Sequence, residues 1–154
     1  MEVYRITTRK YAHDLSGIGA GLYGGRWNPV GMNLVYTAEH ISLAYLEYLV
    51  HNFHILHSQQ VCLVKIRFDA KSLQEIDRSE LPQDWNEKSY LPRSTQLLGA
   101  SILNNEKPYA LKVPSAISSE EHNILLNPAH PNHASTKIIE IVDPFQLDSR
   151  LTLS

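Results

Sequence analysis

Short apolar runs, separated by stretches that contain glycine, proline or polar residues, set the hydrophobic pattern of this chain. Runs of this length that are rich in Val, Ile, Leu and Tyr predict β-strands. In VCLVKIRF at 61–68, the apolar Val64, Ile66 and Phe68 alternate with charged residues, as in a strand with one buried face. The pattern predicts strands at 34–37, 61–68, 109–113 and 138–142, and a weaker strand at 72–76.

Two segments have the features of helices. Residues 41–53 (ISLAYLEYLVHNF) contain no glycine or proline and several good helix formers. Residues 95–103 form the second predicted helix, with Ser94 as its N-cap, and a long proline-marked connection at 82–92 precedes it. Strands and helices that follow one another without regular β-α-β alternation predict the α+β class.

Two prolines follow predicted strands closely. Pro114 comes directly after the run at 109–113, and Pro144 comes soon after the run at 138–142. Proline has no N–H group to donate to a neighbouring strand, so we expect both strands to stop there.

Size and charge narrow the class of protein. With 154 residues the chain is long enough for one core, so we expect a single domain over 1–154. A formal net charge of -2 gives no basic field for nucleic acid, and no segment has the apolar length of a membrane span. The N-terminus has no apolar signal region. The one cysteine, Cys62, excludes an intrachain disulfide and fits a reducing compartment, so we expect a cytoplasmic protein that binds neither nucleic acid nor membranes.

Glycines gather around one arginine. Six of the seven glycines lie between 17 and 31, and Arg26 stands within GGRWNPVG at 24–31. Such a loop allows unusual backbone angles and close approach to a ligand. The guanidinium of Arg26 can donate two parallel hydrogen bonds to a phosphate or carboxylate, although a solvated surface arginine would give the same sequence.

Glu47 is the most informative single position. It lies in the middle of the predicted helix, with Leu43, Ala44 and Val50 as its helical neighbours. Because an unpartnered buried carboxylate is costly, Glu47 needs a cation, a hydrogen-bond donor or a catalytic role. A structural ion pair with an arginine and a catalytic carboxylate both remain open at this point.

Three further residues are candidates for the same site. Tyr36 lies on the strand between the glycine loop and the Glu47 helix, where a plain core role is the alternative. Ser115 follows Pro114 directly and can donate a hydrogen bond to Glu47 or to a substrate, or cap a turn before Glu120 and Glu121. Asn123 is either a site residue or an ordinary hydrogen-bonding residue of a turn.

The histidines do not favour a metal site. His51, His54 and His57 are three residues apart, so on a helix they would fan out instead of converging on one ion. We interpret them as surface or helix-end residues and expect no metal.

Taken together, these motifs resemble the RES-domain family, named for an Arg, a Glu and a Ser, whose members are toxins of RES–Xre toxin–antitoxin systems. The resemblance covers nearly the whole chain. It rests on YRI (4–6), GIGA (17–20), GGRWNPVG (24–31), VYTA (35–38), SLAYLE (42–47), VPSA (113–116), EHN (121–123), LLNPAHP (125–131) and DSRL (148–151).

The resemblance implies an ADP-ribosyltransferase-like fold, with NAD⁺ as substrate and no further cofactor. It assigns Arg26, Tyr36, Glu47 and Ser115 to the active site and Asn123 to its neighbourhood. Arg26 would then hold the pyrophosphate, and Glu47 would stabilise the cation formed when the nicotinamide–ribose bond breaks or would orient the nucleophile. Tyr36 would stack on the nicotinamide or hydrogen-bond near it, and Ser115 would position Glu47 or a ribose hydroxyl.

The resemblance also implies partners: a helix-turn-helix antitoxin of the Xre type, and self-association. Two stretches depart from the family pattern, at 99–102 and 132–133, and they bear on antitoxin contact or substrate preference. Three activities remain open. The first is consumption of NAD⁺ by hydrolysis or phosphorolysis, the second is mono-ADP-ribosylation of a protein, and the third is non-catalytic NAD binding. The charge balance disfavours a nucleic-acid regulator.

Overall fold

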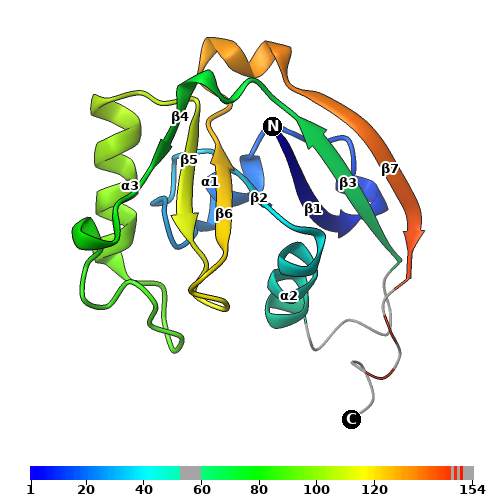
Figure 1. The fold of residues 1–154 in the computed structure, drawn as a ribbon, viewed down its shortest axis with the longest axis horizontal. Helices are drawn as coiled ribbons and strands as arrows, with labels where there is room; N and C mark the ends of the chain where they lie inside the picture. The colour runs from blue at the N-terminus through cyan, green and yellow to red at the C-terminus, as the bar shows by residue number, and fades with distance from the viewer. Residues whose placement is uncertain (53–59, 147, 149, 151–154) are drawn as a thin grey trace.

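A mixed sheet of seven strands forms the centre of the molecule in the computed structural model, which describes residues 1–52, 60–146, 148 and 150. The strand order is β4-β5-β6-β2-β1-β3-β7 (Figure 1). Neighbouring strands are antiparallel except β4 and β5, which are parallel. The strands are β1 (Glu2–Thr8), β2 (Val35–Ala38), β3 (Val61–Arg67), β4 (Leu73–Glu75), β5 (Ala110–Pro114), β6 (His122–Leu126) and β7 (Lys137–Phe145).

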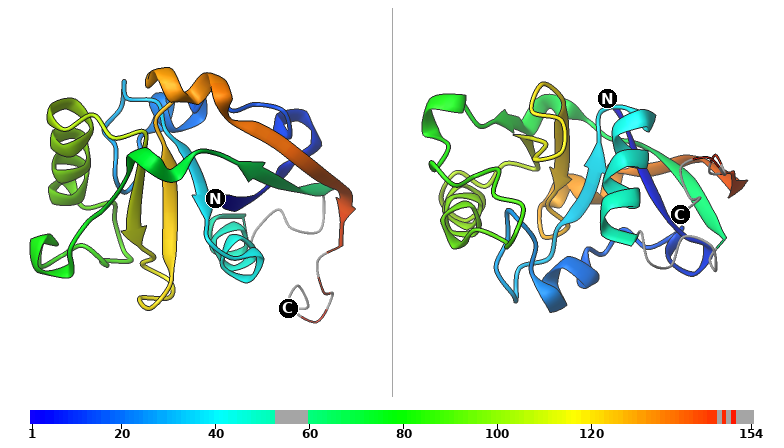
Figure 2. Two further views of the ribbon diagram at one scale, coloured as in Figure 1. Left: turned by 45° about the horizontal axis from the view of Figure 1, so that its top comes forward. Right: turned by 90° about the horizontal axis from the view of Figure 1, so that it is seen from below.

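Two longer helices flank the sheet at separate places. Helix α2 (Ile41–Asn52) contacts β1 and β2, whereas α3 (Arg93–Asn105) lies near the end of the sheet formed by β4 and β5 (Figures 1 and 2). The short helix α1 (Ile18–Tyr23) precedes the glycine-rich loop. Four 3₁₀ helices complete the described elements: η1 (Arg9–Tyr11), η3 (Ala70–Ser72), η4 (Arg78–Glu80) and η5 (Pro131–Ser135). No helix among them is long and apolar enough to cross a membrane.

The core has three parts, which follow the alternation of side chains along the strands. Helix α2 packs its buried side against Ile6 and Leu63 of the sheet. Helix α3 and the 27–34 segment pack against Leu111, Val113 and Leu125. The remaining strand residues, among them Val64, Ile124 and Leu126, form the core on the opposite face. The glycine loop, α2 and α3 therefore all lie on one face of the sheet.

The predicted strands and helices are present, with most boundaries shifted by one or two residues and the end of β7 by three. Two strands, β1 and β6, the short helix α1 and the 3₁₀ helices were not predicted. Strand β1 (EVYRITT) has few strong apolar residues, yet it lies between β2 and β3 in the middle of the sheet. Five of its seven residues are β-branched or aromatic, which favours a strand and is a signal that the sequence prediction missed. The end of the helix predicted for 41–53 falls outside the described residues.

Two local predictions were wrong. Helix α3 begins at Arg93 with Pro92 as its N-cap, and the hydroxyl of Ser94 instead donates to the Asp84 carboxylate at 2.5 Å. A hydrogen bond to a charged carboxylate is stronger than one to a neutral group, so the Ser94 hydroxyl pairs with Asp84 and does not cap the helix. Strand β7 continues through Pro144 to Phe145, because β7 is an edge strand and one of its sides needs no N–H donors. Strand β5 does end at Pro114.

Candidate active site

Helix α2 presents Glu47 at the edge of its packed surface. Leu43 and Ala44, one turn earlier, are buried against the sheet and fix the rotation of the helix. Glu47 lies beside them with a side chain that is 24% exposed. Leu43 and Ala44 therefore hold the carboxylate at the boundary between core and solvent, whereas Val50, the third neighbour named from the sequence, is exposed.

Two residues, one directly after β5 and one in β6, hold one oxygen of this carboxylate. The hydroxyl of Ser115 donates to Glu47 Oε1 at 2.9 Å, and the amide of Asn123 donates to the same oxygen at 2.5 Å. Ser115 and Asn123, which come 68 and 76 positions after Glu47 in the sequence, thus both bind one of its oxygen atoms. Glu47 Oε2 receives neither of these bonds and stays available to a ligand.

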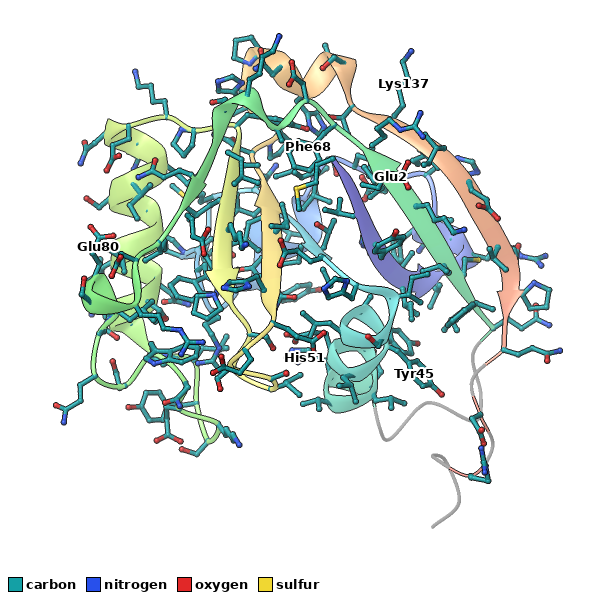
Figure 3. The ribbon with its side chains drawn as sticks, in the orientation of Figure 1. Glu2, Tyr45, His51, Phe68, Glu80 and Lys137 are labelled. Carbon is teal, nitrogen blue, oxygen red and sulfur yellow. The ribbon has the colours of Figure 1, made fainter. Side chains whose placement is uncertain are left out.

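His51 lies on the Oε2 side. It is one turn after Glu47 on α2, and its Nε2 is 3.7 Å from Glu47 Oε2. Figure 3 labels His51 on the side of α2 that faces the hairpin of β5 and β6. Burial raises the pKa of Glu47, but the interactions with His51, Asn123 and Ser115 outweigh it, so the pKa lies below the usual value. Glu47 is therefore ionised at neutral pH.

Ser115 combines two of the roles considered for it. It is fully buried and follows the last residue of β5. Its hydroxyl accepts hydrogen bonds from the N–H groups of Ile117 and Ser118, which is the turn-capping role, while it donates to Glu47. The turn orients the hydroxyl, so its proton is directed at the carboxylate.

Asn123 lies in a strand, and its interpretation as a turn residue was wrong. It is in β6, where it pairs with Ala38 of β2 and Val113 of β5. The polar cluster before it gave no strand signal because its side chains face either the site or solvent. A central strand is a rigid support, which suits a residue that orients a carboxylate.

Tyr36 is bonded to the glycine loop through its hydroxyl. This hydroxyl donates to Asn28 Oδ1 at 2.7 Å and accepts the N–H of Trp27 at 3.1 Å. A Cβ atom added to Gly25 would stand 2.4 Å from the same hydroxyl, which explains why a glycine is needed there. Burial raises the pKa of Tyr36 strongly. Because its proton is committed to Asn28, Tyr36 offers a ligand mainly its ring.

Arg26 does not form an ion pair with Glu47 among the described contacts. Its guanidinium donates from Nη1 to the carbonyl of Trp85 and from Nη2 to the carbonyl of Glu87, both at 2.8 Å. Burial lowers the pKa of Arg26, and the Glu47 carboxylate opposes this effect, which places the two charges near each other. Arginine stays charged in proteins, and three of its five N–H groups remain for an anion.

Asn28 is a residue that the sequence analysis did not single out. It is fully buried, and its amide donates to the carbonyls of Ala20 and Met32 while its oxygen accepts from Tyr36. Asn28 thereby closes the loop that carries Arg26. His51 was also missed as a neighbour of Glu47, although the spacing of four residues on a helix is a usable signal.

No metal site is apparent in the part of the chain that the structure describes. No three His, Cys, Asp or Glu side chains there are placed to share an ion. His51 is an exposed residue of the last turn of α2, whereas His54 and His57 lie outside the described residues. A separate hollow of about 630 Å³ is lined by β1, η1 and the other side of α2, and it contains none of the five candidate residues.

Comparison with known families matches this chain over almost its whole length. The profile described as "RES domain" matches residues 2–148. A protein of Photorhabdus laumondii named "Toxin Res" is 38% identical over 98% of this chain and 97% of its own length. A protein of Sphingobium sp. strain YBL2 named "Prs ADP-ribosylating toxin" is 37% identical over 87% of this chain and 86% of its own.

A solved structure shares the fold. The chain is similar to a protein in the crystal structure of the M. tuberculosis MbcT–MbcA toxin–antitoxin complex, with a TM-score of 0.74 and 18% identity over 92% of this chain and 82% of that one. The α+β class and the ADP-ribosyltransferase-like fold predicted from the sequence are confirmed.

Proposed function

Because this chain belongs to the RES-domain family, we propose that it is the toxin of a toxin–antitoxin pair and that it consumes NAD⁺ at the site around Glu47. The observation that carries the proposal is the carboxylate itself. Glu47 is ionised, one oxygen is fixed by Ser115 and Asn123, and the other oxygen faces the exposed His51 on the partly accessible side of the carboxylate.

The proposed reaction cleaves the bond between the nicotinamide nitrogen and ribose C1′. The bonding electrons return to the nicotinamide ring and cancel its charge, while C1′ becomes cationic, as in glycoside cleavage. Water or phosphate then forms the new bond to C1′, and water gives up a proton to solvent. A fixed carboxylate next to C1′ stabilises the cationic transition state more than it stabilises the neutral ribose of the substrate.

The other residues have supporting roles in this proposal. Arg26 uses its remaining N–H groups on the pyrophosphate, and the ring of Tyr36 packs against the nicotinamide or ribose. Ser115 and Asn123 orient Glu47. NAD⁺ is the substrate, and the reaction as written needs no additional cofactor.

The experiment is incubation of purified protein with NAD⁺, with and without phosphate, followed by product analysis. ADP-ribose indicates hydrolysis, and a phosphorylated ADP-ribose that appears only with phosphate indicates phosphorolysis. Intact NAD⁺ under both conditions, together with no modified protein in a lysate, would contradict the enzyme proposal.

Substitution of Glu47 by Gln tests the carboxylate. The Gln oxygen can still accept from Ser115 and Asn123, so the variant should fold and bind NAD⁺ but lose turnover by a factor on the order of 10²–10³. Glu39→Gln is the matched control, because Glu39 is 19% exposed and bonded to Lys112 and His122 instead. It should keep wild-type turnover, and equal losses in both variants would argue for a general effect of lost charge.

Transfer of ADP-ribose to a protein is a second candidate. The similarity to the Sphingobium protein named "Prs ADP-ribosylating toxin" supports it. The same oxocarbenium-like cation would then be attacked by a side chain of a target protein. Incubation of a lysate with labelled NAD⁺ distinguishes the two, since transfer leaves label on protein whereas consumption leaves it on small molecules.

An antitoxin partner follows from the proposed function, because unrestrained NAD⁺ consumption harms the producing cell. The solved structure with the same fold comes from a toxin–antitoxin complex, which supports this part of the proposal. We further propose that the antitoxin is of the helix-turn-helix Xre type and that the toxin self-associates. The first is tested by the gene beside this one, and the second by light scattering of the purified toxin.

A further inference from the structure

Helix α3 approaches the loop that carries Arg26 and contacts its backbone. The side chain of Gln96 donates to the carbonyl of Gly25 at 2.9 Å, and the hydroxyl of Thr95 donates to the carbonyl of Arg26 at 2.6 Å. Gly99, one turn later, packs so closely against the carbonyl of Trp27 that an added Cβ would stand 2.1 Å from its oxygen. Three consecutive carbonyls of the loop thus face the first turns of one helix.

The guanidinium of Arg26 is held by the segment that leads into the same helix. Trp85 and Glu87 supply its two carbonyl acceptors. The segment is tied to α3 by the bond from Ser94 to Asp84. Residues 84–96 therefore hold Arg26 at both ends, its backbone through Thr95 and its side chain through two carbonyls.

Thr95 is the residue on which this arrangement depends most. It is fully buried in a position where an unpaired hydroxyl would be costly. Its single proton is shared between the carbonyls of Arg26 at 2.6 Å and Pro92 at 2.8 Å, so it joins the loop directly to the N-cap of the helix. It touches no group to which the proposed reaction assigns chemistry other than the backbone of Arg26.

We propose that Thr95 is a positioning residue of the dinucleotide site, which sets the place of the Arg26 guanidinium by fixing the backbone beneath it. This inference rests on the proposed function, because it takes NAD⁺ to be the ligand that Arg26 contacts. Loss of the Thr95 hydroxyl frees the Arg26 carbonyl and lets the loop shift by a fraction of an ångström. A shift of that size misplaces a bidentate donor, so it weakens binding of an anion more than it weakens the fold.

The test compares Thr95→Val with Thr95→Ser. Valine keeps the shape and removes the hydroxyl, whereas serine keeps the hydroxyl. Thr37→Val is the matched control, since Thr37 is also buried and its hydroxyl donates to the carbonyl of Ile124 at 2.6 Å. Each change is made in the Glu47→Gln protein, so that NAD⁺ is bound without being consumed, and thermal unfolding is measured alongside.

We expect Thr95→Val to raise the Kd for NAD⁺ about tenfold, in keeping with the loss of one buried hydrogen bond. Thr95→Ser should restore the Kd to within about twofold of the parent, as expected when a hydroxyl and not a shape is required. Thr37→Val should lower the melting temperature to a similar extent and leave the Kd unchanged. Arg26→Lys, which cannot form the two-pronged bond, serves as the positive control for lost affinity.

A Thr95→Val protein that binds NAD⁺ as tightly as its parent would overturn the inference, as would an equal loss of affinity in Thr37→Val. Hydrogen exchange of the amides in the segment 24–28 tests the same contact without substrate. Exchange should rise in Thr95→Val and not in Thr37→Val, and unchanged exchange in both would also overturn the inference. If the Glu47→Gln parent itself binds no NAD⁺, the proposed function fails, and exchange alone then decides the role of Thr95.

Discussion

At the scale of single residues, the negative charge of Glu47 is the most important property of this site. Its ionised form receives hydrogen bonds from Ser115 and Asn123 and faces His51, and these interactions lower its pKa despite burial. The same contacts that keep the carboxylate ionised and oriented therefore also contribute to the stability of the fold.

This linkage predicts a pH dependence of stability. A carboxyl group whose pKa is lower in the folded than in the unfolded protein stabilises the fold fully above its unfolded pKa. That contribution is lost as the pH falls from the ordinary value of 4.5 through the lower folded value. Urea unfolding at a series of pH values should show that the wild type loses stability below pH 4.5 more steeply than Glu47→Gln.

The comparison between the two proteins isolates Glu47, because every other acid titrates in both. Parallel curves below that pH would mean that the hydrogen bonds to Glu47 do not favour its charged form. A steeper loss in the Glu47→Gln variant would have the wrong sign for a lowered pKa.

Helix α3 is the element whose role is least visible in the sequence. Its N-terminal turns contact the backbone of the Arg26 loop through Thr95, Gln96 and Gly99. A glycine inside a helix usually weakens it, and replacement by alanine usually stabilises it by about 0.5–1 kcal/mol. The contact with Trp27 explains why a glycine stands at this position.

Gly99→Ala should therefore destabilise the protein, against the general trend for helices. The added methyl group would meet the Trp27 carbonyl at 2.1 Å, so either the helix or the loop must move. Overpacking of this kind costs about 1–3 kcal/mol. Gly19→Ala in α1 is the control, since nothing lies within 4 Å of the added atom. Urea unfolding should show a loss only in Gly99→Ala, and equal stability of both variants would contradict the described packing.

At the scale of the whole molecule, the segment that carries Arg26 is notable because it has few charges and several exposed apolar side chains. Between 15 and 38 the only charged side chain is that of Arg26. Leu22, Tyr23 and Val30 are exposed there, with Tyr23 83% accessible. Exposed apolar side chains on the segment that carries Arg26 suit a protein partner better than they suit water.

The proposed antitoxin is expected to cover this surface and the site together. Co-expression of the neighbouring Xre-type protein should restore growth, and the purified complex should consume NAD⁺ far more slowly than the toxin alone. Equal rates would exclude occlusion of the site. Tyr23→Asp should weaken inhibition and leave the rate of the free toxin unchanged. Tyr11→Asp, at an exposed tyrosine of η1, is the control and should remain inhibited.

The sequence by itself determined the fold class and most of the elements. Alternation in VCLVKIRF and the uninterrupted helix formers around Glu47 are local signals, and local signals survive without tertiary context. The order of the motifs along the chain is specific enough to indicate the RES family from the sequence alone. Glu47 was singled out because a carboxylate buried among apolar helical neighbours is costly unless it has a partner or a function.

Only the tertiary structure decided which groups meet. The sequence left open whether Asn123 is a site residue or a turn residue, and whether an arginine is the cation for Glu47. In the structure Asn123 lies on β6 and donates to Glu47, while Arg26 donates to the carbonyls of Trp85 and Glu87. For Arg26, the reason is that a hydrogen bond to a backbone carbonyl does not depend on the residue type of the acceptor. A carbonyl is present at every position, so the sequence cannot show which ones a guanidinium or a threonine hydroxyl will reach. Pairing of β6 with β2 and β5 placed Asn123, and packing of the 84–96 segment against the glycine loop placed the partners of Arg26. Both arrangements belong to the folded molecule and not to any local stretch of sequence.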